Sequence, residues 1–85
     1  MEVTFKYFAW VRERIGLSEE KALLPEGVQT IGDAIQWLKQ RGGGYAAAFE
    51  REDIIRAAID HAHAKHSAPV TGAREIAFFP PVTGG

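Results

Sequence analysis

The chain has 85 residues, 46% of them hydrophobic, and a formal net charge of −1 from 10 basic and 11 acidic residues. These values suit one small domain with a single core and exclude the broad basic field typical of nucleic-acid-binding proteins. Without cysteine, the chain has no disulfide, thiolate zinc site or sulfur nucleophile. No apolar run approaches the roughly 20 residues that span a bilayer. Because the start Met1-Glu2-Val3 is also too polar for a signal peptide, we expect a cytoplasmic protein.

The first third of the chain predicts a strand, a short helix and a second strand. Residues 3–8 alternate apolar and polar side chains, except that Phe8 is apolar on the polar side. Residues 9–16 predict a helix closed by glycine, with Trp10, Val11 and Ile15 able to share one face. Residues 20–24 predict the second strand, followed by a turn at 25–27.

Residues 30–41 predict the main helix. Thr30 and Asp33 have the spacing of a capping box, and one apolar stripe follows: Ile31, Ala34, Ile35 and Leu38, with Trp37 beside it. Gly42-Gly43-Gly44 lacks the ending of a phosphate-binding loop and follows a helix, so we interpret it as a helix stop and a flexible loop. Residues 45–49 predict one further helical turn that packs its two aromatic rings onto the core.

The segment 53–66 supports two opposing predictions. Its alanine content and apolar spacing favour a helix begun by Asp53, whereas the alternation over residues 54–59 also fits a strand. The three histidines lie here, and neither geometry brings His61, His63 and His66 together. We therefore expect solvated or hairpin-edge histidines and no metal site.

The sequence ends in A77-F-F-P-P-V-T-G-G85, after a predicted strand over residues 75–79. Pro80 and Pro81 cannot donate ladder hydrogen bonds and favour extended geometry, so they end the strand while keeping the chain straight. Gly84 and Gly85 have no side chains, so this segment could enter a channel too narrow for a Cβ atom.

A terminal carboxylate would be the reactive group of such a tail. A free carboxylate is a poor electrophile, so its chemistry would need activation by another enzyme, most simply as a mixed anhydride with a nucleotide phosphate. The protein would then be a carrier. Two glycines alone fit a frayed end equally well. The carrier function is indicated by the combination of an apolar strand, a diproline and a glycine pair.

The segment "AFFPPVTGG", with "VTFKYFAWVRERIG" near the start, resembles the small, sulfur-carrying subunits of molybdopterin synthases, which are ubiquitin-like sulfur carriers. The resemblance spans essentially the whole chain. It implies an α+β fold of the β-grasp type, a mixed sheet crossed by one main helix, with a short extra helix after the first strand. It also implies strands at 54–59 and about 62–66 joined by a turn near Asp60-His61, against local propensity. The domain would cover 1–79, and 80–85 would form a flexible tail.

The resemblance further implies the chemistry. An E1-like enzyme would use ATP and Mg²⁺ to adenylate Gly85, and a sulfur donor protein would convert it to a thiocarboxylate. The chain itself would bind no cofactor and have no activity alone. The tail would enter the large synthase subunit, in a heterotetramer of two small and two large subunits, and donate sulfur to cyclic pyranopterin monophosphate to build the dithiolene of molybdopterin. Two other functions remain open: a carrier for another pathway, such as thiamine thiazole synthesis, and a ubiquitin-like modifier of lysines.

The resemblance and the strand pattern together predict a partner-binding surface. Phe8 and Phe79 both fall on the sheet face away from the main helix, so they could form one exposed apolar patch, with Arg12 at its rim. The alternative is that the short helix covers both rings. The predicted partner contacts are Phe8, Arg12, Phe79, Pro80, Pro81, Val82, Thr83 and Gly84.

Overall fold

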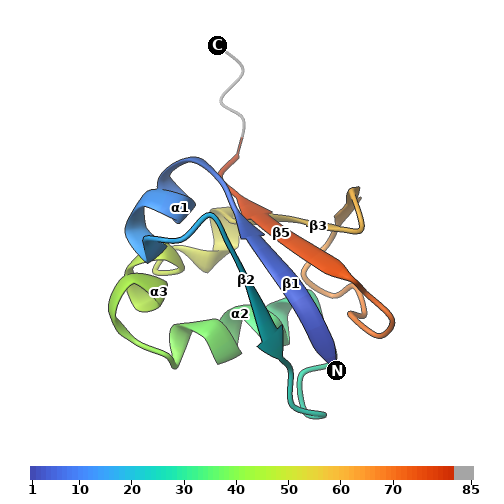
Figure 1. Cartoon of the computed structure of the whole chain (residues 1–85). Coiled ribbons are helices and arrows are strands. Elements are labelled where there is room, and N and C mark those ends of the chain that lie inside the picture. The colour runs from blue at the N-terminus through green and yellow to red at the C-terminus, as the bar shows by residue number, and fades with distance from the viewer. Residues whose placement is uncertain (82–85) are drawn as a thin grey trace.

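The computed structural model describes residues 1–81 and leaves 82–85 outside the described part. Five strands form one mixed sheet, with three helices and a short 3₁₀ helix packed around it (Figure 1). The elements in chain order are β1 (Glu2–Tyr7), α1 (Ala9–Ile15), β2 (Glu19–Leu23), α2 (Ile31–Lys39), α3 (Gly43–Ala48), a 3₁₀ helix (Glu52–Ile54), β3 (Arg56–Ile59), β4 (Ala62–Ala64) and β5 (Glu75–Phe79).

The strands lie in the order β2-β1-β5-β3-β4. The central pair, β1 and β5, is parallel, and the other pairs are antiparallel. Since the first and last strands of the chain lie side by side and run in the same direction, both finish at the same end of the sheet, with Tyr7 opposite Phe78. This is the β-grasp arrangement, and the α+β prediction is confirmed.

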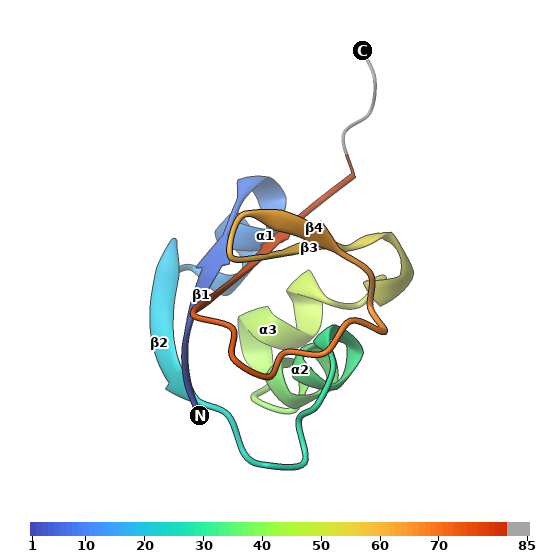
Figure 2. The same cartoon turned by 90° about the vertical axis from the view of Figure 1, so that its right-hand side faces the viewer.

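One face of the sheet is covered by helices, as Figure 2 shows for α2 and α3. The alternation of β1 sends every second side chain to this face, and these side chains are buried. Three aromatic rings meet there. The ring centroid of Phe78 lies 5.9 Å from that of Phe5 and, on the side of α3, 5.2 Å from that of Phe49. The predicted stripe of α2 joins the same core, since Ile31, Ala34, Ile35 and Leu38 are all buried.

The predicted capping box of α2 is present. The Thr30 hydroxyl accepts a hydrogen bond from the Asp33 amide at 3.1 Å, and the Asp33 carboxylate accepts one from the Thr30 amide at 3.1 Å. The same carboxylate accepts from the Gln29 amide at 3.0 Å. These backbone hydrogen bonds hold the pKa of Asp33 below its usual range.

The prediction of a flexible loop at the glycine triplet is wrong, because Gly43 and Gly44 belong to α3. The helical turn predicted at 45–49 is therefore longer, and Phe49 follows it as a buried residue. Gly44 packs against the end of α1: a Cβ atom there would lie 2.2 Å from the Arg14 carbonyl oxygen. The triplet therefore allows two helix backbones to approach closely, a non-local requirement that the spacing of the glycines did not reveal.

The helix favoured by local propensity over 53–66 is also wrong. Only residues 52–54 are helical, as one 3₁₀ turn, and a β3–β4 hairpin follows. Its turn is formed by Asp60 and His61, which both have positive φ values of 47° and 72°. The Asp60 carboxylate accepts hydrogen bonds from the amides of Arg74 and Glu75. Pairing of β3 with β5 outweighs the modest helix preference of the alanines.

Glu20 connects the second strand to the helical layer. Its carboxylate accepts hydrogen bonds from the hydroxyls of Tyr7 and Tyr45 and pairs with Arg41 at 3.1 Å. Burial, followed by the hydrogen bond to Glu20, raises the pKa of Tyr7. The buried Tyr7 hydroxyl is thereby satisfied, so this cluster stabilises the contact between β2 and α3.

Candidate functional site

The root of the predicted tail lies at the end of a central strand. β5 is paired on both sides, with β1 and β3, and Pro80 and Pro81 follow it as half-buried residues outside any strand. Neither proline has an N–H to continue the ladder, which explains why the strand ends at Phe79. The predicted site residues Val82, Thr83, Gly84 and Gly85 lie outside the described residues, so their roles stay predictions.

Phe8 and Phe79 differ from their neighbours by facing away from the core. Phe8 directly follows β1, in extended conformation as the residue before α1, and is 46% exposed. Phe79 is half-buried at the end of β5. The alternative in which α1 covers both rings is therefore wrong for Phe8. Val11 carries the buried face of α1 instead, and Trp10 and Ile15 pack beside it as predicted.

The open face of the sheet surrounds these two rings. The strand registers place Lys6 opposite Ala77, Ala58 opposite Ala77, and Arg56 opposite Phe79, so these side chains share one face. On β4, His63 is opposite Ala58, and its ring meets Phe79 edge-on at 5.5 Å. We call this set the open-face patch: Phe8, Arg56, Ala58, His63, Ala77 and Phe79.

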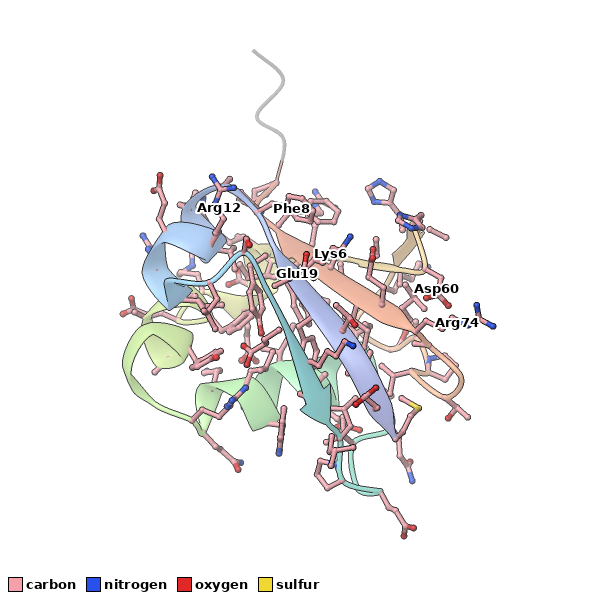
Figure 3. All side chains as sticks on the ribbon, viewed as in Figure 1. Lys6, Phe8, Arg12, Glu19, Asp60 and Arg74 are labelled. Atoms are coloured by element: carbon pink, nitrogen blue, oxygen red, sulfur yellow. The ribbon has the colours of Figure 1, made fainter. Side chains whose placement is uncertain are left out.

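Charged side chains border the open-face patch. Lys6 and Glu75 form an ion pair at 3.0 Å, and the hydrogen bond to Glu75 raises the pKa of Lys6. His61 Nδ1 lies 3.7 Å from the other oxygen of Glu75. Arg12 is exposed on α1, at the same end of the sheet as Phe8 (Figure 3). Because Tyr7 lies opposite Phe78 and β5 ends at Phe79, the structure brings Arg12, Phe8 and Phe79 to the end of the sheet from which Pro80 and Pro81 continue the chain.

Sequence reasoning did not assign Arg56 to this surface. Its position depends on the antiparallel register between β3 and β5, which pairs it with Phe79. The turn near Asp60-His61, which the resemblance implied, fixes only the register between β3 and β4. The pairing of Arg56 with Phe79 depends on the separate register between β3 and β5, which joins distant segments and which no local pattern fixes.

The histidines do not form a metal centre. Within residues 1–81, no three His, Cys, Asp or Glu side chains gather as a metal site requires. His66 instead places Nε2 at 2.8 Å from the Ile55 carbonyl oxygen. In the same part of the chain, no helix has the length and apolar character needed to cross a bilayer.

Comparisons with known proteins agree with this architecture. The chain is 35% identical over 79 residues to the molybdopterin synthase sulfur carrier subunit of Haemophilus influenzae, covering 93% of this chain and 94% of that protein. It is also 35% identical over 81 residues to the subunit of the same name in Escherichia coli, with the same coverage. A crystal structure of the small archaeal modifier protein 1 of Haloferax volcanii superposes with a TM-score of 0.69 at 26% identity, covering 95% of this chain and 98% of that one.

The model of the ThiS family matches residues 5–85, nearly the full length of the sequence. The match includes residues 5–7 of β1, the whole of β5 and the tail, and two relatives at 35% identity each cover 93% of the chain. The chain therefore belongs to the ThiS family.

Proposed function

We propose that this protein is the sulfur carrier subunit of a molybdopterin synthase. The observation that carries the proposal is the identity of 35% over 93% of the chain to two proteins of that name. The described structure supports it by its geometry. β5 is paired on both sides and ends at Phe79, so Pro80 and Pro81 follow a firmly held central strand, as suits a subunit that presents its own C-terminal glycine as the reacting group.

The reacting group in this proposal is the carboxylate of Gly85. An E1-like activating enzyme transfers the adenylyl group of ATP to it, with Mg²⁺ on the nucleotide and pyrophosphate leaving. A sulfur donor protein then delivers the sulfur that replaces AMP, leaving a thiocarboxylate. ATP and Mg²⁺ belong to the activating enzyme, and the carrier itself holds no cofactor. Because activation consumes ATP, we place these steps in the cytoplasm.

The large synthase subunit receives the loaded tail. Sulfur passes to cyclic pyranopterin monophosphate, and two such transfers complete the dithiolene of molybdopterin. We propose that the open-face patch docks on the large subunit while the segment from Pro80 to Gly85 enters its active site, in an assembly of two small and two large subunits. The exposed ring of Phe8 and the half-buried ring of Phe79, next to Pro80 and Pro81, suit this division between docking and delivery.

The decisive experiment reconstitutes the transfer. Thiocarboxylated protein is mixed with the large subunit and cyclic pyranopterin monophosphate, and dithiolene product is measured. We expect product with the parent chain, and none with a variant lacking Gly85 or extended by one residue, since the reacting carbonyl would be misplaced. Thermal melts should show that both variants fold normally. Full transfer by the extended variant would refute the role of Gly85.

Mass spectrometry separates this function from the two alternatives. Exchange of one oxygen for sulfur at Gly85 supports a carrier, and transfer of that sulfur to a substrate other than the pterin would indicate another pathway. Isopeptide adducts on lysines would instead indicate a protein modifier.

A further inference from the structure

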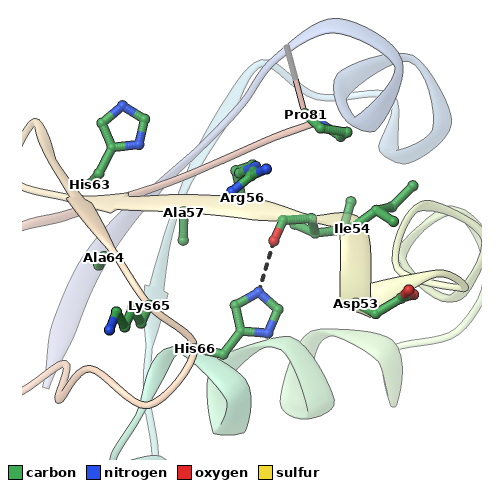
Figure 4. A pocket seen from close by; sticks show the side chains of 10 residues that line it. Asp53, Ile54, Arg56, Ala57, His63, Ala64, Lys65, His66 and Pro81 are labelled. Atoms are coloured by element: carbon green, nitrogen blue, oxygen red, sulfur yellow. Dashed lines mark hydrogen bonds between the residues drawn. The ribbon is translucent and has the colours of Figure 1, made fainter. Parts of the chain in front are cut away.

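A groove lies beside the tail root and shares Arg56 and His63 with the open-face patch. It has a volume of about 610 Å³ and lies where the β3–β4 hairpin opens toward the 3₁₀ helix (Figure 4). The walls of the groove include the apolar residues Ile54 and Ile55, which precede β3, and Ala57 within β3. Pro81 also lines the groove. Arg56, His63, Lys65 and one acidic residue, Asp53, also line it. The groove therefore combines apolar walls with basic side chains next to the segment that leads to Gly85.

The acidic side chains near Arg56 are already engaged by other partners. Asp53 pairs with Arg51 at 3.4 Å, which lowers the pKa of Asp53. Glu52 accepts hydrogen bonds from Lys39 and Gln36, which lower its pKa in the same way. Asp53 lines the groove, but it and Glu52 pair with Arg51 and Lys39 and not with Arg56.

Arg56 and Lys65 are exposed, and within residues 1–81 neither forms an ion pair or a side-chain hydrogen bond. On the open face, Glu75 forms an ion pair with Lys6 at 3.0 Å and none with Arg56. Figure 4 shows Arg56 on the same side of β3 as His63 and Pro81. A guanidinium in this position can bind a carboxylate through two parallel hydrogen bonds.

We propose that this groove binds an acidic segment of the large synthase subunit, with Arg56 as the residue that determines specificity. This inference rests on the proposed function. Charge complementarity indicates the occupant: the guanidinium of Arg56 suits the carboxylate of an aspartate or glutamate, and the apolar walls accommodate the adjoining backbone and methylene groups. Arg56 lies opposite Phe79 in the sheet, so a partner docked on the open-face patch reaches the groove without a second interface.

The test measures binding of the full-length variants to the large subunit at several salt concentrations. Arg56→Gln should weaken the Kd about tenfold at low salt and flatten its salt dependence, because a screened charge contact is removed. Arg56→Glu should weaken binding further. Arg74→Gln is the matched control: Arg74 is also exposed but precedes β5, at the end of the strand far from Pro81. It should bind like the parent.

A charge exchange identifies the occupant. If an aspartate or glutamate of the large subunit lies in the groove, its replacement by arginine should restore binding to Arg56→Glu and weaken binding to the parent. Parent-like affinity and salt dependence of Arg56→Gln, with binding still lost in Phe79→Ala, would overturn the groove proposal and leave the proposed function standing. Failure of the parent itself to bind would overturn the proposed function.

A phosphate control distinguishes binding of a protein carboxylate from binding of a phosphate group. Inorganic phosphate and AMP are titrated into the carrier alone and followed by amide NMR shifts of residues 54–57 and 63–66. We expect no saturable binding. Saturable binding of either that is lost in Arg56→Gln would overturn the proposal by showing that the groove serves a nucleotide phosphate and not a protein carboxylate.

Discussion

The two faces of the sheet place neighbouring aromatic residues in opposite surroundings. Phe78 is fully buried among Phe5, Tyr7 and Phe49 on the helix-covered face. Phe79, one residue later, is half-buried on the open face and contacts the ring of His63. Because side chains of a strand alternate, a single strand contributes one ring to the core and the next to a surface. We therefore expect substitutions at these two adjacent positions to change stability and partner binding separately.

The largest expected effect is on the covered face. Phe78→Ala removes a fully buried ring and should lower the free energy of unfolding by about 3–5 kcal/mol, from the lost burial and the cavity that remains. Since a small domain has only about 5–15 kcal/mol in total, this variant should unfold at moderate denaturant concentration. Urea titration gives the value. A variant with parent-like stability and impaired binding would reverse the assignment of the two faces.

The second effect is on the open face. Phe79→Ala should weaken binding to the large subunit, and to the activating enzyme, by about 2 kcal/mol or more, as for a central contact residue, with little change in the unfolding transition. Titration calorimetry beside a thermal melt measures both quantities. Leu23→Ala is the control, because Leu23 is 73% exposed and is paired with Glu2 at the other end of the same face. A Phe79→Ala variant that melts early but binds normally when folded would place Phe79 in the core.

The covered face was largely predictable from the sequence. The alternation in residues 3–7 and the stripe of Ile31, Ala34, Ile35 and Leu38 are local periodicities, and they gave both the elements and their buried sides. The capping residues Thr30 and Asp33 were likewise local. Local patterns predict the elements well because each core-facing side chain repeats with the period of its own helix or strand.

The open face was predictable only in part. Phe8 stood out as an apolar residue on the polar side of its strand, and Phe79 fell on the strand face opposite Ile76 and Phe78. The exposure of Phe8 agrees with that interpretation. The position of Arg56 depends on pairing with a strand about 20 residues away, and the contact of Gly44 with Arg14 depends on two helices meeting. Propensity carries no information about such non-local contacts. The resemblance to the sulfur carriers, by contrast, gave the β3–β4 hairpin correctly.

A smaller effect is expected in the helical layer alone. Thr30→Ala removes the hydroxyl that accepts a hydrogen bond from the Asp33 amide. It should lower the free energy of unfolding by about 1 kcal/mol, the usual cost of losing an N-cap. Since α2 lies across the covered face, binding of the large subunit should be unchanged. Urea titration and calorimetry on the same preparation check both statements. Weakened binding at unchanged stability would show that the two faces are coupled.

The smallest effect is the pH dependence of the same cap. The Asp33 pKa is lowered in the folded state by hydrogen bonds from the Gln29 and Thr30 amides. A lowered folded pKa stabilises the protein above the unfolded value, about 3.9, and this contribution is lost as the pH falls through the folded pKa. Asp33→Asn keeps the side-chain shape and an acceptor oxygen but has no charge. The parent should therefore be more stable than Asp33→Asn near neutral pH, and the two should converge in acid.

Urea titrations of the parent and Asp33→Asn between neutral pH and about pH 3 test this convergence, which should begin only below about pH 4. Glu26→Gln is the control: Glu26 is exposed, and no hydrogen bond to its side chain is found within residues 1–81, so its charge lacks the backbone donors that act on Asp33. A difference between the parent and Asp33→Asn that stayed constant through the acid range would mean that the carboxylate charge does not contribute to the cap. The Thr30 hydroxyl would then account for the stabilisation of α2, and the helical layer would have no acid-sensitive contact at this end.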